Sequence, residues 1–234
     1  SRTSTLVTRT GSWKNIWPVY HDREAPCKQG CPVGIDIEGY MNLLREGRVE
    51  EARALLLAEN PMPSVTGRVC HHPCESACNR RHFDEAVSIH AVERMLGDLV
   101  LEAPDPPEAA VAREERVAII GSGPAGLACA WHLARFGYQV TVFEAAAEPG
   151  GMLRLGIPEY RLPRRVLDRD IERIRSLGVE FQCGTRAGIE PDWPSLHANF
   201  EAIFLASGAH LSRGLGVPGE DGSGVRCGLD FLKN

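Results

Sequence analysis

The sequence lacks a long apolar run and lacks any block of like charge. No stretch approaches the roughly 20 apolar residues of a membrane-spanning helix, and the N-terminal residues lack the apolar core of a signal peptide. The formal net charge of -5 is spread along the chain, so no basic face favours nucleic acid or an anionic membrane. We therefore expect a cytoplasmic protein with no nucleic acid and no membrane among its partners.

The sequence also shows no internal repeat and no second glycine-rich fingerprint. Its 234 residues, 43% hydrophobic and 24% charged, suffice for one large or two small domains. The chain has eight cysteines, of which five fall in two tight clusters in the first third. In an intracellular protein such clusters favour metal binding over disulfides.

A glycine-rich turn joins an apolar strand to a helix within residues 116–135. Its spacing is GxGxxG: Gly121 permits the tight turn, Gly123 lets the backbone approach a pyrophosphate, and Gly126 lets the helix pack on the strand. A second strand ends at Glu144, roughly 20 residues further on, where a carboxylate can bind the ribose hydroxyls of an adenosine. A glycine-rich turn without a ligand is the alternative. The predicted cofactor-binding residues here are Gly121, Gly123, Pro124, Ala125, Gly126 and Glu144.

Strands and helices alternate after this turn. The expected elements are strands at 139–143, 179–182 and 200–209 and an amphipathic helix at 164–177. Past the second strand, Gly151 lets the backbone pass close to a cofactor, and the last strand ends in a small-residue turn at Gly208 that can approach it too. Arg154 and Arg161 are available for phosphate or for a flavin-facing hydrogen bond.

Apolar periodicity predicts helices in the first third of the chain. Asp36 can cap a helix that stops at Gly47, and residues 49–59 form the second arm of a helical hairpin. We expect a loop at 63–67 and another helix at 88–101.

Five cysteines carry the metal-binding pattern; they are Cys27, Cys31, Cys70, Cys74 and Cys78. The first two are spaced CxxxC before a proline, and the last three stand four residues apart, which on a helix drifts only about 40° per step. Since Pro73 suits a first helical turn, Cys74 and Cys78 can share a helix that Cys70 approaches from the loop. Zinc sites usually use CxxC knuckles, so we predict one [4Fe–4S] cluster, with zinc or inert buried thiols as alternatives.

These motifs together resemble the small (beta) subunit of NADPH-dependent glutamate synthase, a module that also occurs in the N-terminal part of dihydropyrimidine dehydrogenase. The resemblance covers nearly the whole chain and is carried by CxxxCP at 27–32, GRVCHHPCESAC at 67–78, AVSIHAVE at 86–93, GSGPAG at 121–126, PGGMLRLGIPEYRLP at 149–163 and LASG at 205–208. It implies FAD in this chain, with Met152 and Arg161 near the flavin. It also implies an NAD(P)H domain just beyond the end of the chain.

The resemblance fails at one place. Glutamate synthase small subunits carry a further CxxC pair before CxxxCP, and this sequence has no cysteine there. Two clusters need about eight ligands, so one cluster is expected. The fourth ligand stays open between Cys27, Cys78 and Glu93. The ligands implied by the resemblance to dihydropyrimidine dehydrogenase are Cys31, Cys70 and Cys74.

The expected organisation combines α+β and α/β features in several domains. The predicted segments are an extended arm at 1–22, an all-helical iron–sulfur domain at 23–101, a linker at 102–115 and an incomplete Rossmann-like FAD-binding α/β domain at 116–234.

Three functions are consistent with this organisation. The favoured one is an electron-transfer subunit that links NAD(P)H, FAD and the iron–sulfur centres of larger redox subunits, such as those of a 2-oxoacid:acceptor oxidoreductase. The second is a glutamate synthase small subunit, and the third is a non-catalytic cofactor-binding or assembly module. No residue of the chain is predicted to act as a catalytic acid, base or nucleophile.

Overall fold

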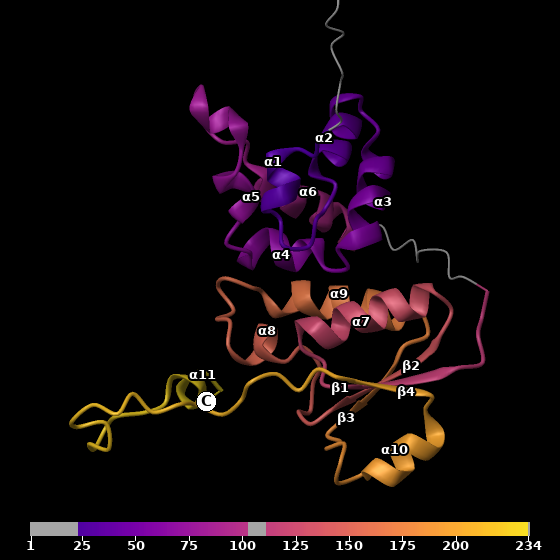
Figure 1. The fold of residues 1–234 in the computed structure, drawn as a ribbon, viewed down its shortest axis with the longest axis vertical. Helices are drawn as coiled ribbons and strands as arrows, with labels where there is room; N and C mark the ends of the chain where they lie inside the picture. The colour runs from indigo at the N-terminus through magenta and orange to yellow at the C-terminus, as the bar shows by residue number, and fades with distance from the viewer. Residues whose placement is uncertain (1–22, 103–110, 234) are drawn as a thin grey trace, which may run out of the picture.

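The computed structural model describes residues 23–102 and 111–233. The predicted arm at 1–22 and most of the predicted linker lie outside these residues. In Figure 1 a helical region lies above an α/β region, and two helices of the α/β region lie between the helical region and the sheet. None of the helices in the described ranges combines the length and the apolar character that crossing a bilayer requires.

The first region consists of helices and loops. Its elements are α1 (Pro26–Gly30), α2 (Ile37–Arg45), α3 (Val49–Glu59), α4 (Pro63–Val69), α5 (Pro73–Ser76), the 3-10 helix η2 (Asn79–His82) and α6 (Ile89–Glu102). As predicted, Asp36 caps α2: its Oδ1 accepts a hydrogen bond from the Gly39 N–H at 3.0 Å. The bounds of α3 also agree with the expected helix at 49–59.

The prediction of a loop at 63–67 is wrong, because these residues form most of α4. Pro63 occupies the first turn of the helix, where a missing N–H costs nothing. Gly67 lies against α6, and a Cβ added there would stand 2.6 Å from Arg94 Cα. The close packing of α4 on α6 therefore stabilises a helix that the local sequence does not favour.

The second region is a parallel four-stranded sheet with helices on both faces. Its elements are β1 (Arg116–Ile120), α7 (Pro124–Arg135), β2 (Gln139–Glu144), α8 (Met152–Leu155), α9 (Arg164–Arg175), β3 (Glu180–Cys183), α10 (Trp193–Asn199), β4 (Ala202–Leu205) and α11 (Gly228–Lys233). The strand order is β3-β2-β1-β4. Sequence analysis missed α8, α10 and α11, and β4 is shorter than the strand expected at 200–209.

The register of the sheet brings the carboxyl ends of its central strands to one edge. Val117 pairs with Val140 on β2 and with Ala202 on β4. The chain reverses direction across the sheet at β1, and ligands of open α/β sheets bind outside the strand ends at such a point. In Figure 1, α7 and α9 cover one face of the sheet and α10 lies on the other.

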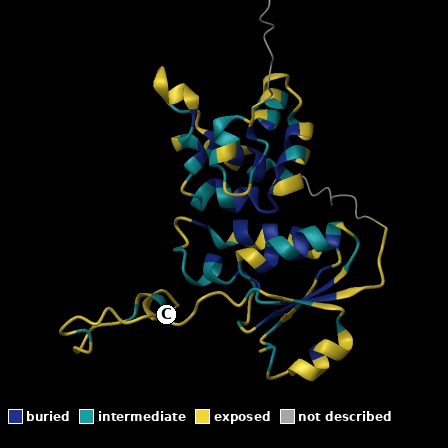
Figure 2. Ribbon diagram, in the orientation of Figure 1, coloured by how far each residue is buried: buried dark blue, intermediate teal, exposed yellow. Residues whose placement is uncertain are grey.

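One hydrophobic core spans the two regions. Met62 and Val65 of the helical region belong to the same buried cluster as Trp131 of α7 and Leu167 of α9. Figure 2 shows this buried layer along α7 and α9, whereas the segment that follows β4 is largely exposed. The two regions therefore form one packed body rather than two modules that meet only through a linker.

Polar groups reinforce this contact. Arg173 of α9 donates a hydrogen bond to the carbonyl of Pro61 and another to Asp170 Oδ1 at 3.0 Å. Ser64 Oγ of α4 lies 3.4 Å from the same carboxylate oxygen, and the guanidinium of Arg173 lies 4.5 Å from the ring centre of Trp131. Asp170 is fully buried, so this ion pair lies inside the contact between the regions.

Candidate functional site

The glycine-rich turn connects β1 to α7, and two of its glycines are required by the fold. Gly121 has a φ of +104°, and a Cβ there would stand 2.9 Å from the carbonyl carbon of Ala206. A Cβ at Gly126 would overlap the carbonyl oxygen of Gly121. Both positions therefore exclude a side chain whether or not a ligand is bound.

Gly123 is different. Its φ is −69°, which any residue adopts, and a Cβ added there would meet nothing within 4 Å. It stands at the N-cap of the 12-residue helix α7, and no side chain among the described residues caps the N–H groups of its first turn. Open space at a helix N-terminus suits a pyrophosphate, and Pro124 and Ala125 form the first turn of that helix.

Glu144 is buried and organises the turn. Its Oε2 accepts hydrogen bonds from the N–H and Oγ of Ser122, and its Oε1 accepts one from the Ala146 N–H at 2.8 Å. A carboxylate offers about four acceptor sites, so one remains after these three bonds. Glu144 can therefore accept a hydrogen bond from one ribose hydroxyl, where the sequence suggested both.

Ser122 is a residue that sequence analysis missed, since GxGxxG leaves its position unspecified. It is fully buried, and its Oγ accepts a hydrogen bond from the Gly150 N–H at 3.0 Å while donating to Glu144. Gly151, with a φ of +52°, lies so close that a Cβ there would stand 2.7 Å from Gly123 Cα. The double glycine thus packs directly on the glycine-rich turn.

The remaining predicted residues differ in what they contact. Arg154 is committed to the protein: it donates to the Pro149 carbonyl at 2.7 Å and pairs with Asp168 and Glu148. Arg161 is exposed and its side chain makes no hydrogen bond within the described residues. Near the strand ends, Gly123 has open space, Glu144 keeps one acceptor site, and Arg161 and Gly208 are exposed. Gly151 packs on Gly123, and Met152 begins α8 directly after it.

The five clustered cysteines lie in three short helices or directly after them. Cys27 lies in α1 and Cys31 follows it, Cys70 ends α4, and Cys74 lies in α5. The α1 and α5 helices pack closely at Gly30, where a Cβ would stand 2.8 Å from Ala77 Cβ. This contact brings the two cysteine clusters of the sequence together.

The prediction that Cys74 and Cys78 share one helix is wrong. The α5 helix ends at Ser76, and Cys78 has an extended conformation with φ −66° and ψ 124° before η2 begins. Both thiols are buried. The three cysteines therefore do not share one helical face: Cys70 ends α4, Cys74 lies in α5 and Cys78 follows α5 in an extended conformation.

Burial dominates the chemistry of the thiols. It raises the pKa of Cys74 to about 11, with nearby Cys31 and Cys70 acting in the same direction. It also raises the pKa of Cys27, to which Cys78 adds. Several thiols that raise one another's pKa need a bound metal to favour their thiolate form.

Glu93 lies in α6 and is buried. Its Oε1 accepts hydrogen bonds from Thr66 Oγ1 and from Asn60 Nδ2, the latter at 2.7 Å. Burial raises the pKa of Glu93 although these two donors oppose the shift. Thr66 and Asn60 were not singled out from the sequence, because they stand about 30 residues away from the acid they hold.

A smaller polar group borders the thiols. His72, Glu75 and His90 place their ligand atoms within 4.8 Å of one another. However, Glu75 Oε1 already accepts hydrogen bonds from the N–H of His90 at 2.9 Å and from its ring at 2.7 Å. The His72 N–H in turn donates to Cys70 Sγ at 3.4 Å. These residues therefore support the thiol site and the start of α6.

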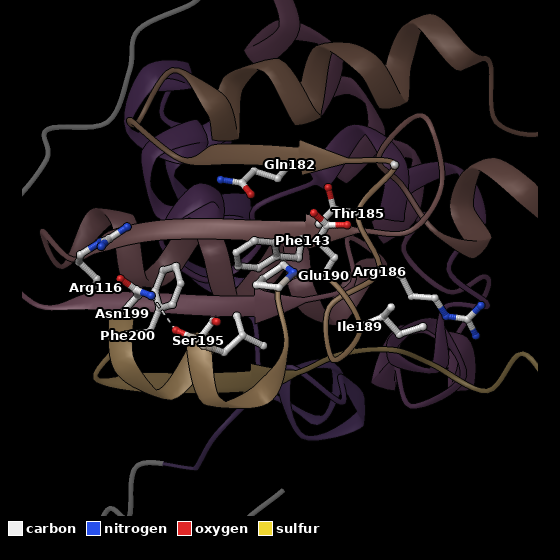
Figure 3. A pocket seen from close by; sticks show the side chains of 13 residues that line it. Arg116, Phe143, Gln182, Thr185, Arg186, Ile189, Glu190, Ser195, Asn199 and Phe200 are labelled. Atoms are coloured by element: carbon white, nitrogen blue, oxygen red, sulfur yellow. Dashed lines mark hydrogen bonds between the residues drawn. The ribbon is translucent and has the colours of Figure 1, made fainter.

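A hollow of about 730 Å³ lies away from both sites, between the sheet and α10. Figure 3 shows the rings of Phe143 and Phe200 at its floor; their centres are 5.8 Å apart in an edge-to-face arrangement. Arg116 lies over the Phe200 ring at 4.8 Å. None of the predicted cofactor-binding or metal-binding residues lines it, so the hollow is separate from the candidate sites.

Two family models match the chain. The model described as dihydropyrimidine dehydrogenase domain II, 4Fe-4S cluster, matches residues 20–104. The model of the NAD(P)-binding Rossmann-like domain matches residues 119–169. The first match contains all five clustered cysteines, and the second contains the glycine-rich turn, Glu144 and the double glycine.

Curated relatives match most of the chain. It is 43% identical over 216 residues to the NADPH-Fe(3+) oxidoreductase subunit beta of Geobacter sulfurreducens, covering 89% of this chain and 32% of the relative. It is 39% identical over 235 residues to the NADP(+)-dependent formate dehydrogenase subunit beta of Moorella thermoacetica, covering 90% and 33%. It is 40% identical over 210 residues to the glutamate synthase [NADPH] small chain of Mycobacterium tuberculosis, covering 88% and 43%. The chain thus spans less than half the length of each of these relatives.

Proposed function

We propose that the chain belongs with the oxidoreductase subunits that resemble the glutamate synthase small subunit and that it is an electron-transfer subunit of an NAD(P)H-linked oxidoreductase complex. It holds FAD at the glycine-rich turn and one [4Fe–4S] cluster at the clustered thiols. Electrons pass between NAD(P)H, FAD, the cluster and the iron–sulfur centres of a larger partner.

The shared core is the observation that carries this proposal. Met62 and Val65, which precede Cys70, are buried together with residues of α7, the helix that starts at Gly123. The two candidate sites are therefore held at a fixed separation. Fixed separation between two redox groups is what electron transfer within one subunit requires, whereas a cluster that only stapled a small helical domain would not need it.

The residues at the strand ends fit FAD. In this proposal the N-terminus of α7 binds the pyrophosphate, and Glu144 accepts a hydrogen bond from one ribose hydroxyl. Gly151 lets the backbone of the double glycine lie against Gly123. We assign Met152, Arg161 and Gly208 to the surroundings of the flavin. When bound, FAD accepts two electrons as a hydride and releases them singly, and an iron–sulfur centre carries one electron at a time.

The clustered thiols fit an iron–sulfur centre better than zinc. Zinc ligands usually come in CxxC knuckles, whereas these thiols lie in or directly after separate short helices. Cys31, Cys70 and Cys74 supply three ligands. The fourth is one of Cys27, Cys78 and Glu93, and replacing each in turn identifies it by the loss of iron.

The partner is a larger redox subunit. The relatives named above are beta subunits or small chains of three different oxidoreductases, and their identities to this chain, 39% to 43%, do not separate them. The absence of the CxxC pair upstream of Cys27 favours a partner other than the large subunit of glutamate synthase.

Purification under anaerobic conditions, together with the subunits that remain bound, tests the function. We expect FAD on denaturation and about four irons per chain. With Cys70→Ser, the complex should still reduce an artificial dye with NAD(P)H but should not exchange electrons with the partner. Zinc in place of iron, absence of FAD, or wild-type coupling without a cluster would each overturn the proposal.

A further inference from the structure

Tyr40 of α2 is the largest polar side chain buried in the helical region. Its exposed fraction is 0%, and its hydroxyl has no hydrogen-bond partner among the described residues. Buried hydroxyls nearly always have a partner, and leaving one without costs about 1–3 kcal/mol. A tyrosine retained at such a position where phenylalanine would pack equally well implies that something accepts its hydrogen bond.

The surroundings of Tyr40 narrow the choice of acceptor. The ring belongs to the buried cluster that includes Cys74, with Cys27 and Cys31 packed against it. Burial raises the pKa of the Tyr40 hydroxyl, and Glu93 and these three thiols act in the same direction. The hydroxyl therefore lies among the groups that are proposed to hold the cluster.

No group among the described residues accepts a hydrogen bond from this hydroxyl. Glu93 Oε1 accepts hydrogen bonds from Thr66 and Asn60. An isolated water would need two to four polar partners, and most neighbours of the ring are aliphatic side chains, among them Ile37, Leu56 and Leu96. Sulfur atoms are the acceptors that remain.

On the basis of the proposed function, we propose that Tyr40 is a positioning residue whose hydroxyl donates a hydrogen bond to a sulfur atom of the iron–sulfur centre and raises its reduction potential. Reduction adds negative charge to the centre. A donor aimed at sulfur stabilises the reduced form more than the oxidised form, and such hydrogen bonds are one of the ways in which proteins set the potential.

Tyr40→Phe tests this in the anaerobically purified holoprotein, because it removes the hydroxyl and keeps the ring. We expect iron content to stay at the wild-type value and the equilibrium constant for one-electron reduction to fall about tenfold, which is ~59 mV toward more negative potential. A redox titration followed by electron paramagnetic resonance measures the potential. The His72 N–H also donates to Cys70 Sγ, so after exchange into D₂O the wild type should show a deuteron coupling beyond that of His72, and Tyr40→Phe should lose this additional coupling.

Tyr138→Phe is the matched control, since it makes the same change in the α/β region, where Tyr138 lies beside Arg113. It should leave both the potential and the deuteron signal unchanged. An unchanged potential in Tyr40→Phe, or deuteron couplings identical to those of the wild type, would overturn the inference. If Tyr40→Phe does not assemble a centre, the wild-type spectrum decides by itself, and the absence of any deuteron coupling beyond that of the His72 N–H refutes the bond. A wild-type protein without iron would refute the proposed function instead.

Discussion

The glycine-rich turn and the thiol site differ in how much of their hydrogen bonding the chain supplies. At the turn, Ser122, Glu144 and Gly150 bind one another, and steric contacts fix the glycines on either side. At the thiol site the Tyr40 hydroxyl has no partner in the part of the chain that the structure describes, and burial raises the pKa of the Cys27 and Cys74 thiols. A dinucleotide site can thus be complete before its ligand binds, whereas a metal site made of thiols is completed by the metal.

The strongest way to break this comparison is to remove a thiol. We expect Cys31→Ser to lose essentially all cluster iron while it retains FAD, because the turn does not depend on the metal. Cys129→Ser, in α7, is the control and should keep both groups. Iron and flavin analysis of the same preparations measures the effect. Loss of FAD together with iron in Cys31→Ser would show that the turn is not independent.

The second contrast lies within the turn. Gly126→Ala should lower the free energy of unfolding by about 3 kcal/mol or more, because its Cβ would overlap the Gly121 carbonyl. Gly123→Ala should stay within about 1 kcal/mol of wild type, since its Cβ meets no protein atom. Its FAD affinity should nevertheless fall at least about tenfold, as the methyl group occupies the space for the pyrophosphate. Denaturant titration and flavin release distinguish these two effects; equal stability losses would contradict the assignment.

The third contrast concerns the buried contact between the helical region and the α/β region. Burial raises the pKa of Asp170 from 3.8 to about 6, although Arg173 and Ser64 oppose the shift. A folded-state pKa above the unfolded value gives a stabilising contribution that is complete below pH 3.8 and is lost as the pH rises through 6. Each pKa unit corresponds to about 1.4 kcal/mol, so the loss amounts to roughly 3 kcal/mol by neutral pH.

Asp170→Asn provides the comparison for this effect. The difference in unfolding free energy between wild type and Asp170→Asn should change with pH between 4 and 6.5, in the direction of a less stable wild type at the higher pH. Urea titrations at several pH values measure it. A difference that is independent of pH would show that Asp170 stays ionised throughout this range.

The smallest effect is expected from Ser122→Ala. It leaves the buried Gly150 N–H without its acceptor and removes one donor to Glu144, so we expect a loss of about 1–2 kcal/mol and weaker retention of FAD. Ser207→Ala, at the same edge of the sheet but exposed, should change stability by less than about 0.5 kcal/mol. If the two variants behave alike, the hydrogen bonds of Ser122 do not organise the turn.

Local sequence signals predicted the parts of the fold that local forces determine. The Asp36 cap, the helix at 49–59 and the alternation of strands and helices after Gly121 all depend on residues a few positions apart. The α10 helix carries the same kind of signal, since Asp192 caps it by accepting a hydrogen bond from the Ser195 N–H at 3.0 Å, and it could have been found.

Contacts between distant segments account for what the sequence did not reveal. Residues 63–67 are helical because Gly67 packs on α6, and Cys78 leaves α5 where the chain turns into η2. The cysteines and glycines of the candidate sites were predictable, as their spacing is local. The supporting residues Ser122, Thr66 and Asn60 were not, because their partners are remote in sequence or lie at positions that the motif leaves unspecified.

The buried contact between α4 and α9 limits how this protein can be recombined with its relatives. A chimera that took the helical region from one relative and the sheet from another would have to inherit Ser64 and Val65 together with Asp170 and Arg173, because each pair is buried against the other region. A chimera should therefore exchange the helical region and the α/β region, including α9, together as one unit. A crossover point placed in the connecting segment would separate residues that need one another.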